Sequence, residues 1–414
     1  MTTASRLLLR LAILLLMSAI TMGWAPTPAG ADGQSWAIVP SPNYGSGDNY
    51  LYSVACVSTS DCTAVGYYDN GTQNATLILH WDGATWAQVA SPTIGNYTNI
   101  LNGVTCVSAS DCTAVGNAYT GVGNETLIVH WDGTSWTRVN SPNVYNNDGL
   151  SDVSCVSAND CTAVGQSYDG AMSRYATLIL HWNGLSWTRM NSPTIGAYNN
   201  FLNSISCVAA SDCTAVGYRQ DSRYITMVMR WDGSTWSEVA SPNVGSGHNF
   251  LSSVACVSST NCTATGYEFE QGHAVSMVFT WDGSTWSPVA IPTISTSANA
   301  LYALDCVSAT SCTAAGYFTD GNGTSVTLIL RWDGTSWTQV TSPNVASTDN
   351  TLVSIDCVSP SECTAIGDFV DSNAQGRYAT LIERSIDPNP PLPPTTSTTT
   401  TTTPTEPVVP TFTG

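Results

Sequence analysis

The chain of 414 residues contains 30 Asp and Glu against only 11 basic residues, and its formal net charge is −19. Such an acidic surface repels phosphate backbones and anionic lipids, which excludes nucleic-acid binding and adsorption to anionic membranes. Length alone would suggest two or three domains, but a sevenfold internal repeat allows one large domain instead.

Residues 1–31 are predicted to be a signal peptide. Arg6 and Arg10 flank the start of an apolar stretch, 11–20, and the small residues 29–31 provide a cleavage site before Asp32. The apolar run is too short for a comfortable membrane span, and an uncleaved N-terminal anchor is the alternative. No later segment is apolar enough to span a membrane. We therefore expect a secreted or cell-surface protein whose mature charge, without the two arginines, is −21.

Fourteen cysteines form seven pairs with five residues between partners, recurring every 49 to 52 residues. An even number of cysteines behind a signal peptide predicts disulfides, whereas zinc sites prefer tighter spacing with converging thiolates. Each bridge would close a short hairpin, for which loop entropy predicts about 2.4 kcal/mol. The predicted pairs are Cys56 with Cys62, Cys106 with Cys112, Cys155 with Cys161, Cys207 with Cys213, Cys256 with Cys262, Cys306 with Cys312, and Cys357 with Cys363.

Each repeat contains four short runs that are typical of β-strands. The first is L-x-x-[VIL]-x-C, as in 101–106, and the second is C-T-A-x-G, which is present in all seven repeats. The third ends in His or Arg followed by Trp in most repeats, as in 76–81, and the fourth is W-x-x-V, as in 86–89. Apolar alternation and Pro-terminated ends favour strands, and four strands in a period of about fifty residues are typical of a propeller blade.

The two ends of the repeat array complement each other. Residues 36–42 resemble a fourth strand with no blade before it, whereas the last repeat ends after its third strand, at 378–382. The N-terminal strand would therefore complete the last blade and close the ring. We predict an all-β fold: a single seven-bladed β-propeller of four-stranded blades, spanning residues 32–387.

The short turns of the repeat have recognisable chemistry. Asp-Gly or Asn-Gly between paired tryptophans, as in 81–86, suits a tight hairpin across which the two rings meet. The Gly after C-T-A-x, as at Gly66, is expected to allow close approach between neighbouring blades. Asn49 and its counterparts, all Asn or Asp, are expected to bond nearby backbone groups in a turn.

Successive hairpins of a propeller alternate between two faces, so the Cys and Trp hairpins share one face and the remaining loops share the other. The first face is nearly constant between repeats and the second varies, and variable loops on a constant scaffold usually bind ligands. Tyrosine combines apolar area with a hydroxyl, which suits recognition; capping of a blade edge is the alternative. The candidate ligand-binding residues are Tyr67, Tyr68, Tyr119, Tyr168, Tyr218, Tyr267 and Tyr317.

A basic residue precedes the first hairpin Trp in five repeats and stands at the equivalent position of the last repeat, whereas Thr280 breaks the series. Two roles fit this pattern: structural pairing with the hairpin Asp or stacking on Trp, which we favour, and a ring of anion sites. The residues are His80, His130, His181, Arg230, Arg331 and Arg384.

No catalytic motif and no metal-ligand cluster is found in the sequence, so we predict no catalytic residues, no metal and no cofactor. Glu268 and Glu270 are close in sequence, as two carboxylates in acid–base chemistry could be. We interpret them instead as solvated loop charges. Whether the protein is an enzyme is left open, with a preference for a non-catalytic role.

Residues 388–414 form a Pro- and Thr-rich segment that is expected to be disordered and extended, like a spacer. It carries no anchor that we can identify.

The W-[DN]-G-x-x-W hairpin within a four-strand repeat resembles the blades of fucose-binding lectin-type propellers, taken as seven-bladed. The resemblance covers the hairpin and the strand order, and it implies sugar sites between blades that use Trp with Arg and Glu; here the Trp residues match, but no Glu recurs. Repeats rich in "WDGTSW", "SPN" and "CTAVG" are also similar to those of secreted actinobacterial repeat proteins, over nearly the whole mature chain.

The leading functional hypothesis is a secreted, non-catalytic binding module with a carbohydrate as ligand or, second, a surface protein as partner. An extracellular glycan hydrolase or lyase and a structural cell-surface protein are the alternatives. Carboxylates without partners near the axis would favour the enzyme, and aromatic clefts between blades would favour the lectin. We expect a monomer.

Overall fold

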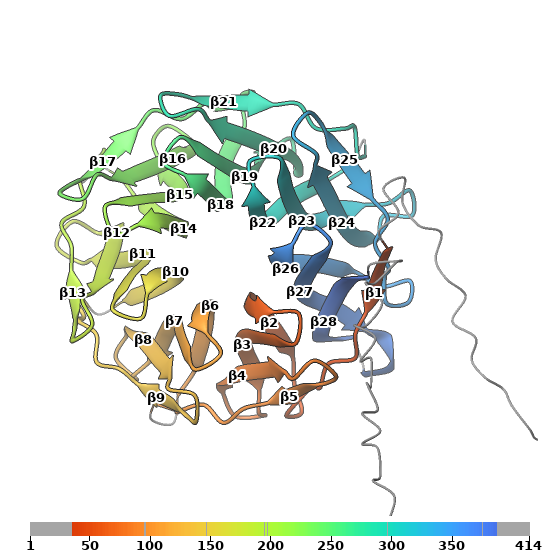
Figure 1. Ribbon diagram of the computed structural model, residues 1–414, viewed down its shortest axis with the longest axis horizontal. Helices are drawn as coiled ribbons and strands as arrows, with labels where there is room; N and C mark the ends of the chain where they lie inside the picture. Colours follow the sequence, from red (N-terminus) through yellow and green to blue (C-terminus); the bar gives the residue numbers. More distant parts are fainter. Residues whose placement is uncertain are drawn as a thin grey trace, which may run out of the picture.

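The computed structural model describes residues 35–386 except 95, 96, 146, 194, 197, 296 and 375. The predicted signal peptide (1–31) and the predicted Pro/Thr-rich tail (388–414) lie outside the described residues. Seven four-stranded antiparallel sheets surround a central axis as blades of a ring (Figure 1). The predicted seven-bladed propeller is confirmed. The described residues contain no helix that is long and apolar enough to cross a membrane.

Blades 1 to 6 each use four consecutive strands, numbered outward from the axis. Blade 1 has β2 (Asn49–Ser58), β3 (Asp61–Asp69), β4 (Asn74–Trp81) and β5 (Trp86–Gln88); blade 2 has β6 (Asn99–Ser108), β7 (Asp111–Tyr119), β8 (Asn124–Trp131) and β9 (Trp136–Arg138). Blade 3 has β10 (Asp148–Ser157), β11 (Asp160–Asp169), β12 (Arg174–Trp182) and β13 (Trp187–Arg189); blade 4 has β14 (Asn200–Ala209), β15 (Asp212–Gln220), β16 (Tyr224–Trp231) and β17 (Trp236–Val239). Blade 5 has β18 (His248–Ser258), β19 (Asn261–Glu270), β20 (His273–Trp281) and β21 (Trp286–Val289); blade 6 has β22 (Asn299–Ser308), β23 (Ser311–Thr319), β24 (Ser325–Trp332) and β25 (Trp337–Val340).

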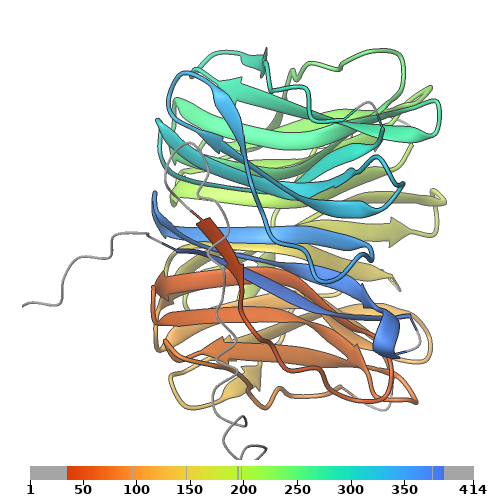
Figure 2. The ribbon, with the colours of Figure 1, turned by 90° about the vertical axis from the view of Figure 1, so that its right-hand side faces the viewer.

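Blade 7 combines the two ends of the described chain. It contains β26 (Asn350–Ser359), β27 (Glu362–Asp371), the short 3₁₀ helix η1 (Ser372–Ala374), β28 (Arg377–Ile386) and, as its outer strand, β1 (Ser35–Ile38). β1 pairs antiparallel with β28, with Trp36 opposite Ser385, and the two lie side by side in Figure 2. The predicted closure of the ring by the N-terminal strand is therefore confirmed, and it leaves no blade incomplete.

The hydrophobic core consists of layers between neighbouring blades. Leu51 and Leu77 of blade 1 pack against Ile366 and Ile382 of blade 7. The other side of blade 1 presents Val65 and Ile78 to blade 2. All of these side chains are completely buried. Because both faces of every blade are covered in this way, the apolar second and third strands of the repeat are explained.

The invariant glycine serves a contact within a blade, and the expectation that it allows close approach between blades was wrong. A β-bulge interrupts every innermost strand between its Leu and the second residue after it, as between Leu51 and Ser53. Because of the bulge, the side chains of Leu51 and Val54 both face the hydrophobic core. In a regular strand, residues three positions apart would point to opposite faces. The bulge also brings the carbonyl of Tyr50 against Gly66, where a Cβ would lie 2.0 Å from that oxygen.

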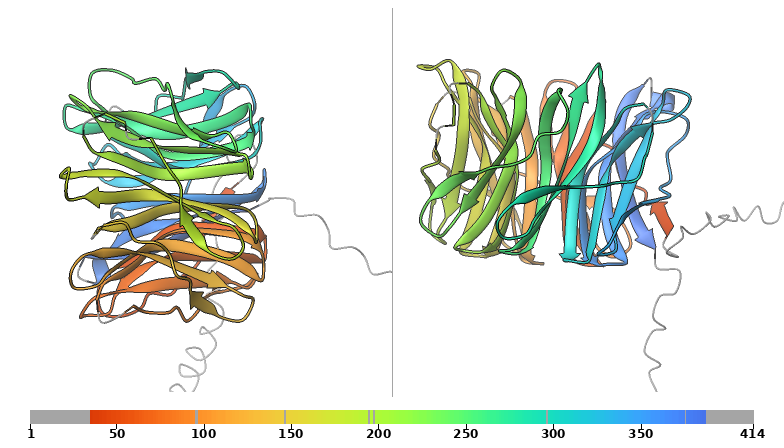
Figure 3. Two further views of the ribbon diagram at one scale, coloured as in Figure 1. Left: turned by 90° about the vertical axis from the view of Figure 1, so that its left-hand side faces the viewer. Right: turned by 90° about the horizontal axis from the view of Figure 1, so that it is seen from above.

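In blades 1 to 6, the Cys hairpin and the Trp hairpin lie at the same end of the strands, at one face of the ring (Figure 3). All seven predicted disulfides are formed, and Cys56 lies directly opposite Cys62 in the strand register. Trp81 lies opposite Trp86 across the other hairpin, with ring centroids 5.7 Å apart, as predicted. We call the face with these hairpins the constant face and the opposite one the variable face.

Candidate functional site

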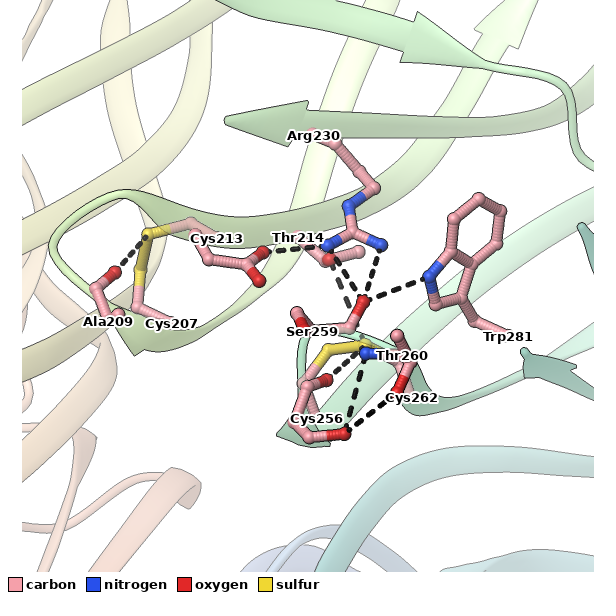
Figure 4. Close-up of polar contacts among 12 residues, drawn as sticks. Cys207, Ala209, Cys213, Thr214, Arg230, Cys256, Ser259, Thr260, Cys262 and Trp281 are labelled. Atoms are coloured by element: carbon pink, nitrogen blue, oxygen red, sulfur yellow. Dashed lines mark hydrogen bonds and ion pairs between the residues drawn. A yellow bond between two sulfur atoms is a disulfide. The ribbon is translucent and has the colours of Figure 1, made fainter. Parts of the chain in front are cut away.

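On the constant face, arginines at the repeated basic position connect neighbouring blades. Figure 4 shows Arg230 of blade 4 reaching the Cys hairpin of blade 5, where its guanidinium donates to the carbonyl of Ser259 at 3.1 Å. The indole of Trp281 donates to the same carbonyl at 3.2 Å, and Arg230 lies 5.0 Å from the centroid of that ring. Arg384 repeats the arrangement with Thr59 and Trp81 across the closing seam.

The histidines at the same repeated position stay within their own blades. His130 lies 3.2 Å from Asp111, and His181 lies 3.1 Å from Asp160. These partners precede the second cysteine, so the expected pairing with the Asp of the Trp hairpin was wrong. That Asp instead accepts backbone N–H groups of its own turn: Asp82 Oδ1 accepts from Ala84 and Thr85 at 2.9 and 2.8 Å. The predicted stacking on Trp holds for Arg230 and Arg384. We therefore interpret the constant face as structural.

The axis of the ring encloses polar cavities. The innermost strands of all seven blades line a cavity of about 270 Å³, and toward the variable face a smaller one of about 100 Å³ is bordered by Tyr52 and Tyr302. Side chains lining this channel accept N–H groups from the innermost strand of the next blade. Ser53 accepts from the N–H of Val104 at 3.1 Å, and the hydroxyl of Ser354 accepts from the N–H of Val54 at 3.2 Å. These bonds satisfy donors that an edge strand otherwise leaves unpaired.

Three carboxylates take part in the same pattern. Asp152 accepts from the N–H of Ile205, Asp305 from that of Cys357, and Asp356 from that of Cys56, each at 2.9 Å. Burial raises the pKa of Asp152 to about 6, and burial together with the charge of Asp305 raises that of Asp356 to about 8. The three carboxylates connect blades, so they are not the partnerless acids that an enzyme at the axis would require. No pattern or motif in the sequence had pointed to these three aspartates.

Aromatic rings gather on the variable face. Eight of them, which we call the aromatic arc, form a chain of contacts across blades 3 to 6, with centroids of successive rings 4.9 to 5.9 Å apart. In order they are Tyr168, Tyr175, Phe201, Tyr218, Phe250, Tyr267, Tyr302 and Tyr317. Every ring of the arc is partly exposed. Tyr218 meets Phe250, and Tyr267 meets Tyr302, across blade boundaries.

A second aromatic group lies where blades 7 and 1 meet. Tyr50, Tyr52 and Tyr67 of blade 1 contact one another, and Tyr378 of blade 7 packs on Tyr50 with centroids 5.1 Å apart. We call these four residues the seam tyrosines. Burial raises the pKa of the Tyr52 hydroxyl well above its usual range, and nearby Tyr67 and Asp368 raise it further. The group therefore has a carboxylate, Asp368, at its side.

The structure brings together five of the seven tyrosines predicted as ligand-binding. Tyr168, Tyr218, Tyr267 and Tyr317 belong to the aromatic arc, and Tyr67 belongs to the seam tyrosines. Tyr68 instead packs on Tyr44, and Tyr119 packs on Tyr97, in separate pairs. Whether any of the seven binds a ligand remains a prediction.

Sequence reasoning missed seven of the twelve residues in the aromatic arc and the seam tyrosines. Five of them come from innermost strands, on either side of the buried Leu: Tyr50, Tyr52, Phe201, Phe250 and Tyr302. Tyr175 and Tyr378 are the second residues of third strands. A comparison of the positions that flank the Leu in each repeat would have found the innermost set, because aromatic residues recur there. The prediction considered only the loops that follow the second strand, so it found only the tyrosines at the end of that strand.

Two further expectations concern loop residues. Asn49 brackets its turn as predicted, because its side chain accepts from the N–H of Tyr44 at 2.8 Å and donates to that residue's carbonyl at 3.0 Å. The interpretation of Glu268 as a solvated charge was wrong: it is 9% exposed, and it accepts from the N–H of Gly247 at 2.9 Å. Glu270 accepts from the hydroxyl of Ser246.

Within the described residues, no three His, Cys, Asp or Glu side chains converge as metal ligands would.

Comparison with known proteins shows the fold and no family. No family model matches the sequence, and no curated protein matches it. Similar solved structures include YCF48 bound to D1 peptide, with 13% identity, a TM-score of 0.54 and coverage of 85% of this chain and 96% of that one. The GH74 xyloglucanase from Xanthomonas campestris has 11% identity and a TM-score of 0.52, with coverage of 84% of this chain and 55% of that one.

The fungal lectin of Aleuria aurantia, described as six-bladed with a fucose recognition mode, has 14% identity and a TM-score of 0.46, covering 72% of this chain and 97% of that one. The sequence resemblance assumed seven blades for such lectins, so the blade number of this neighbour differs from that assumption. At these identities the similarity shows a propeller and nothing finer.

Proposed function

We propose that this protein is a non-catalytic binding module that acts outside the cell and binds a carbohydrate on its variable face. The observation that carries the proposal is the aromatic arc, a continuous row of partly exposed rings over four blades. Aromatic rings offer flat apolar area to the C–H groups of a sugar, and tyrosine hydroxyls add hydrogen bonds. The length of the arc suits an oligosaccharide better than a single sugar.

The setting agrees with an extracellular role. Seven disulfides suit an oxidising compartment, and each closes the Cys hairpin of one blade. The enzymatic alternative gains no support at the axis, because Asp152, Asp305 and Asp356 bond to backbone groups of neighbouring blades. A peptide is the second candidate ligand, since the similar propeller YCF48 is described as bound to one.

The test is a glycan and polysaccharide array probed with the full chain, its disulfides intact. We expect binding to an oligosaccharide that falls up to about tenfold in Tyr218→Ala and Tyr267→Ala, because one aromatic contact is worth roughly 0.5–1.5 kcal/mol. Tyr→Phe variants at both positions keep the ring and separate stacking from hydrogen bonding. Leu185→Ala, which changes a side chain that is 87% exposed on the constant face, is the control.

Thermal unfolding of every variant shows that the fold is intact. No binding across a broad array, or equal loss of binding in the Leu185→Ala control, would contradict the proposal and favour a peptide ligand or a structural role.

A further inference from the structure

One position of the repeat changes chemistry in blade 7. The residue after the invariant Gly is Tyr in blades 1, 4, 5 and 6, at Tyr67, Tyr218, Tyr267 and Tyr317, but it is Asp368 in blade 7. Strand register places Asp368 opposite Thr351 of the innermost strand, at the same level as Tyr67 opposite Tyr50. The carboxylate therefore stands where four other blades present a tyrosine, whereas blades 2 and 3 have Asn117 and Gln166 there.

Tyrosines of both neighbouring blades surround this carboxylate. Burial is the main cause of the raised pKa of the hydroxyls of Tyr50 and Tyr52 in blade 1 and of Tyr302 in blade 6, and the charge of Asp368 raises all three further. Tyr52 and Tyr302 also border the cavity at the variable end of the channel. Asp368 thus lies between the aromatic arc on one side and the seam tyrosines on the other.

Asp368 has no structural role that its contacts reveal. Among the described residues, its side chain accepts no hydrogen bond and forms no ion pair, in contrast to the three axial carboxylates below it. Burial, and then the charge of Asp48, raises its pKa to about 7. A partly buried carboxylate without a donor is costly to the folded state. A ligand that supplied positive charge and N–H donors would remove that cost.

Aromatic faces beside a carboxylate are the arrangement that recognises an ammonium group, since the ring faces and the carboxylate both attract positive charge. The chain contains no lysine that could occupy such a site from within.

We propose that Asp368, with Tyr52, Tyr67 and Tyr302, forms a binding site for a protonated primary amine carried by an amino sugar of the bound glycan. This proposal rests on the proposed carbohydrate binding and specifies the class of glycan: a polymer with free amino groups, such as glucosamine units, in place of acetylated ones. The rings of the arc would contact the following sugar units.

The test is calorimetric titration of the full chain at pH 7 and low salt with a glucosamine hexamer and with the N-acetylglucosamine hexamer. We expect the free amine to bind at least tenfold more tightly, with the preference falling as salt is added. Asp368→Asn should bring the two affinities close to each other. Asp221→Asn, which removes an exposed negative charge from a loop of the same face, should leave the preference intact.

The outcomes separate the two proposals. Equal affinity of both hexamers, or an unchanged preference in Asp368→Asn, would overturn the amine site while leaving carbohydrate binding intact. No binding to any glycan of the array would overturn carbohydrate binding itself. Tighter binding of pentalysine with the same dependence on Asp368 would overturn the assignment to an amino sugar and indicate a protein partner. Tyr302→Ala provides a second variant, expected to weaken only the free-amine hexamer's advantage, should Asp368→Asn fail to fold.

Discussion

Glu383 in β28 accepts a hydrogen bond from the hydroxyl of Ser342, 2.5 Å away, across the boundary between blades 7 and 6. Glu383 is completely buried, and its second carboxyl oxygen has no hydrogen-bond partner in the described part of the chain. The equivalent residue of blade 1 is the buried Leu79. Burial raises the pKa of Glu383 to about 8, although hydrogen bonds with Ser342 and Thr327 oppose the shift.

The first prediction is a pH-dependent stability that Glu383→Gln removes. The pKa of Glu in an unfolded chain is about 4.3, so between about pH 4.5 and 8 the folded state binds more protons than the unfolded state. The contribution of Glu383 to stability is therefore present at low pH and is lost as the pH rises through this window, by roughly 3–5 kcal/mol. Denaturant unfolding at pH 5, 7 and 9 measures the difference between wild type and variant.

The matched control for this experiment is Glu125→Gln, at a side chain that is 41% exposed. A difference between wild type and Glu383→Gln that stays the same at all three pH values would contradict the assignment of a neutral, buried Glu383.

The second prediction concerns the bulge of each innermost strand. Gly66→Ala should destabilise the protein by several kcal/mol, on the order of other large steric substitutions, because the new Cβ would lie 2.0 Å from the carbonyl oxygen of Tyr50. Gly170→Ala is the control, since a Cβ added there would meet no atom within 4 Å and the φ of Gly170 is not positive. Thermal melts decide the matter, and equal melting temperatures for the two variants would be inconsistent with the bulge.

The third prediction tests the bonds between blades along the axis. Asp356→Ser keeps an acceptor for the N–H of Cys56, as Ser154 and Ser206 do in blades 3 and 4, whereas Asp356→Ala removes it. The Ala variant should be about 1–3 kcal/mol less stable than the Ser variant, because a buried donor loses its partner. Urea unfolding at pH 5 compares them, and equal stability would show that water replaces the lost acceptor.

The fourth prediction concerns ring closure. Trp36 of β1 is 3% exposed and packs with Val340 of blade 6 and Leu381 of blade 7, in the blade where the two ends of the described chain meet. Trp36→Ala should cost about 3–5 kcal/mol, the usual range for a buried Trp. It should also increase protease cleavage within β28, which would lose its outer neighbour. Leu185→Ala serves as the exposed control, and a Trp36→Ala protein as stable as this control would contradict closure by β1.

The fold could be predicted from the sequence because its information is local and repeated. Period-two strands, Asp-Gly hairpins, paired cysteines, an extra strand at the N-terminal end and a missing fourth strand in the last repeat specify four strands per blade, seven blades and the closing partner. The L-x-x-V spacing also contained the bulge, but only the register between β2 and β3 assigned Gly66 to it.

The chemistry of the variable face depended on the tertiary structure. Asp368, Tyr52 and Tyr302 belong to three different blades and are far apart in sequence, so their proximity follows only from the order of blades around the axis. Asp305 and Asp356 likewise acquire their raised pKa values from burial in a channel that no single repeat contains. A sequence determines what each blade is, because strand and turn preferences act over a few residues. Which side chains meet between blades is decided by ring closure, since burial and charge interactions depend on distances in space.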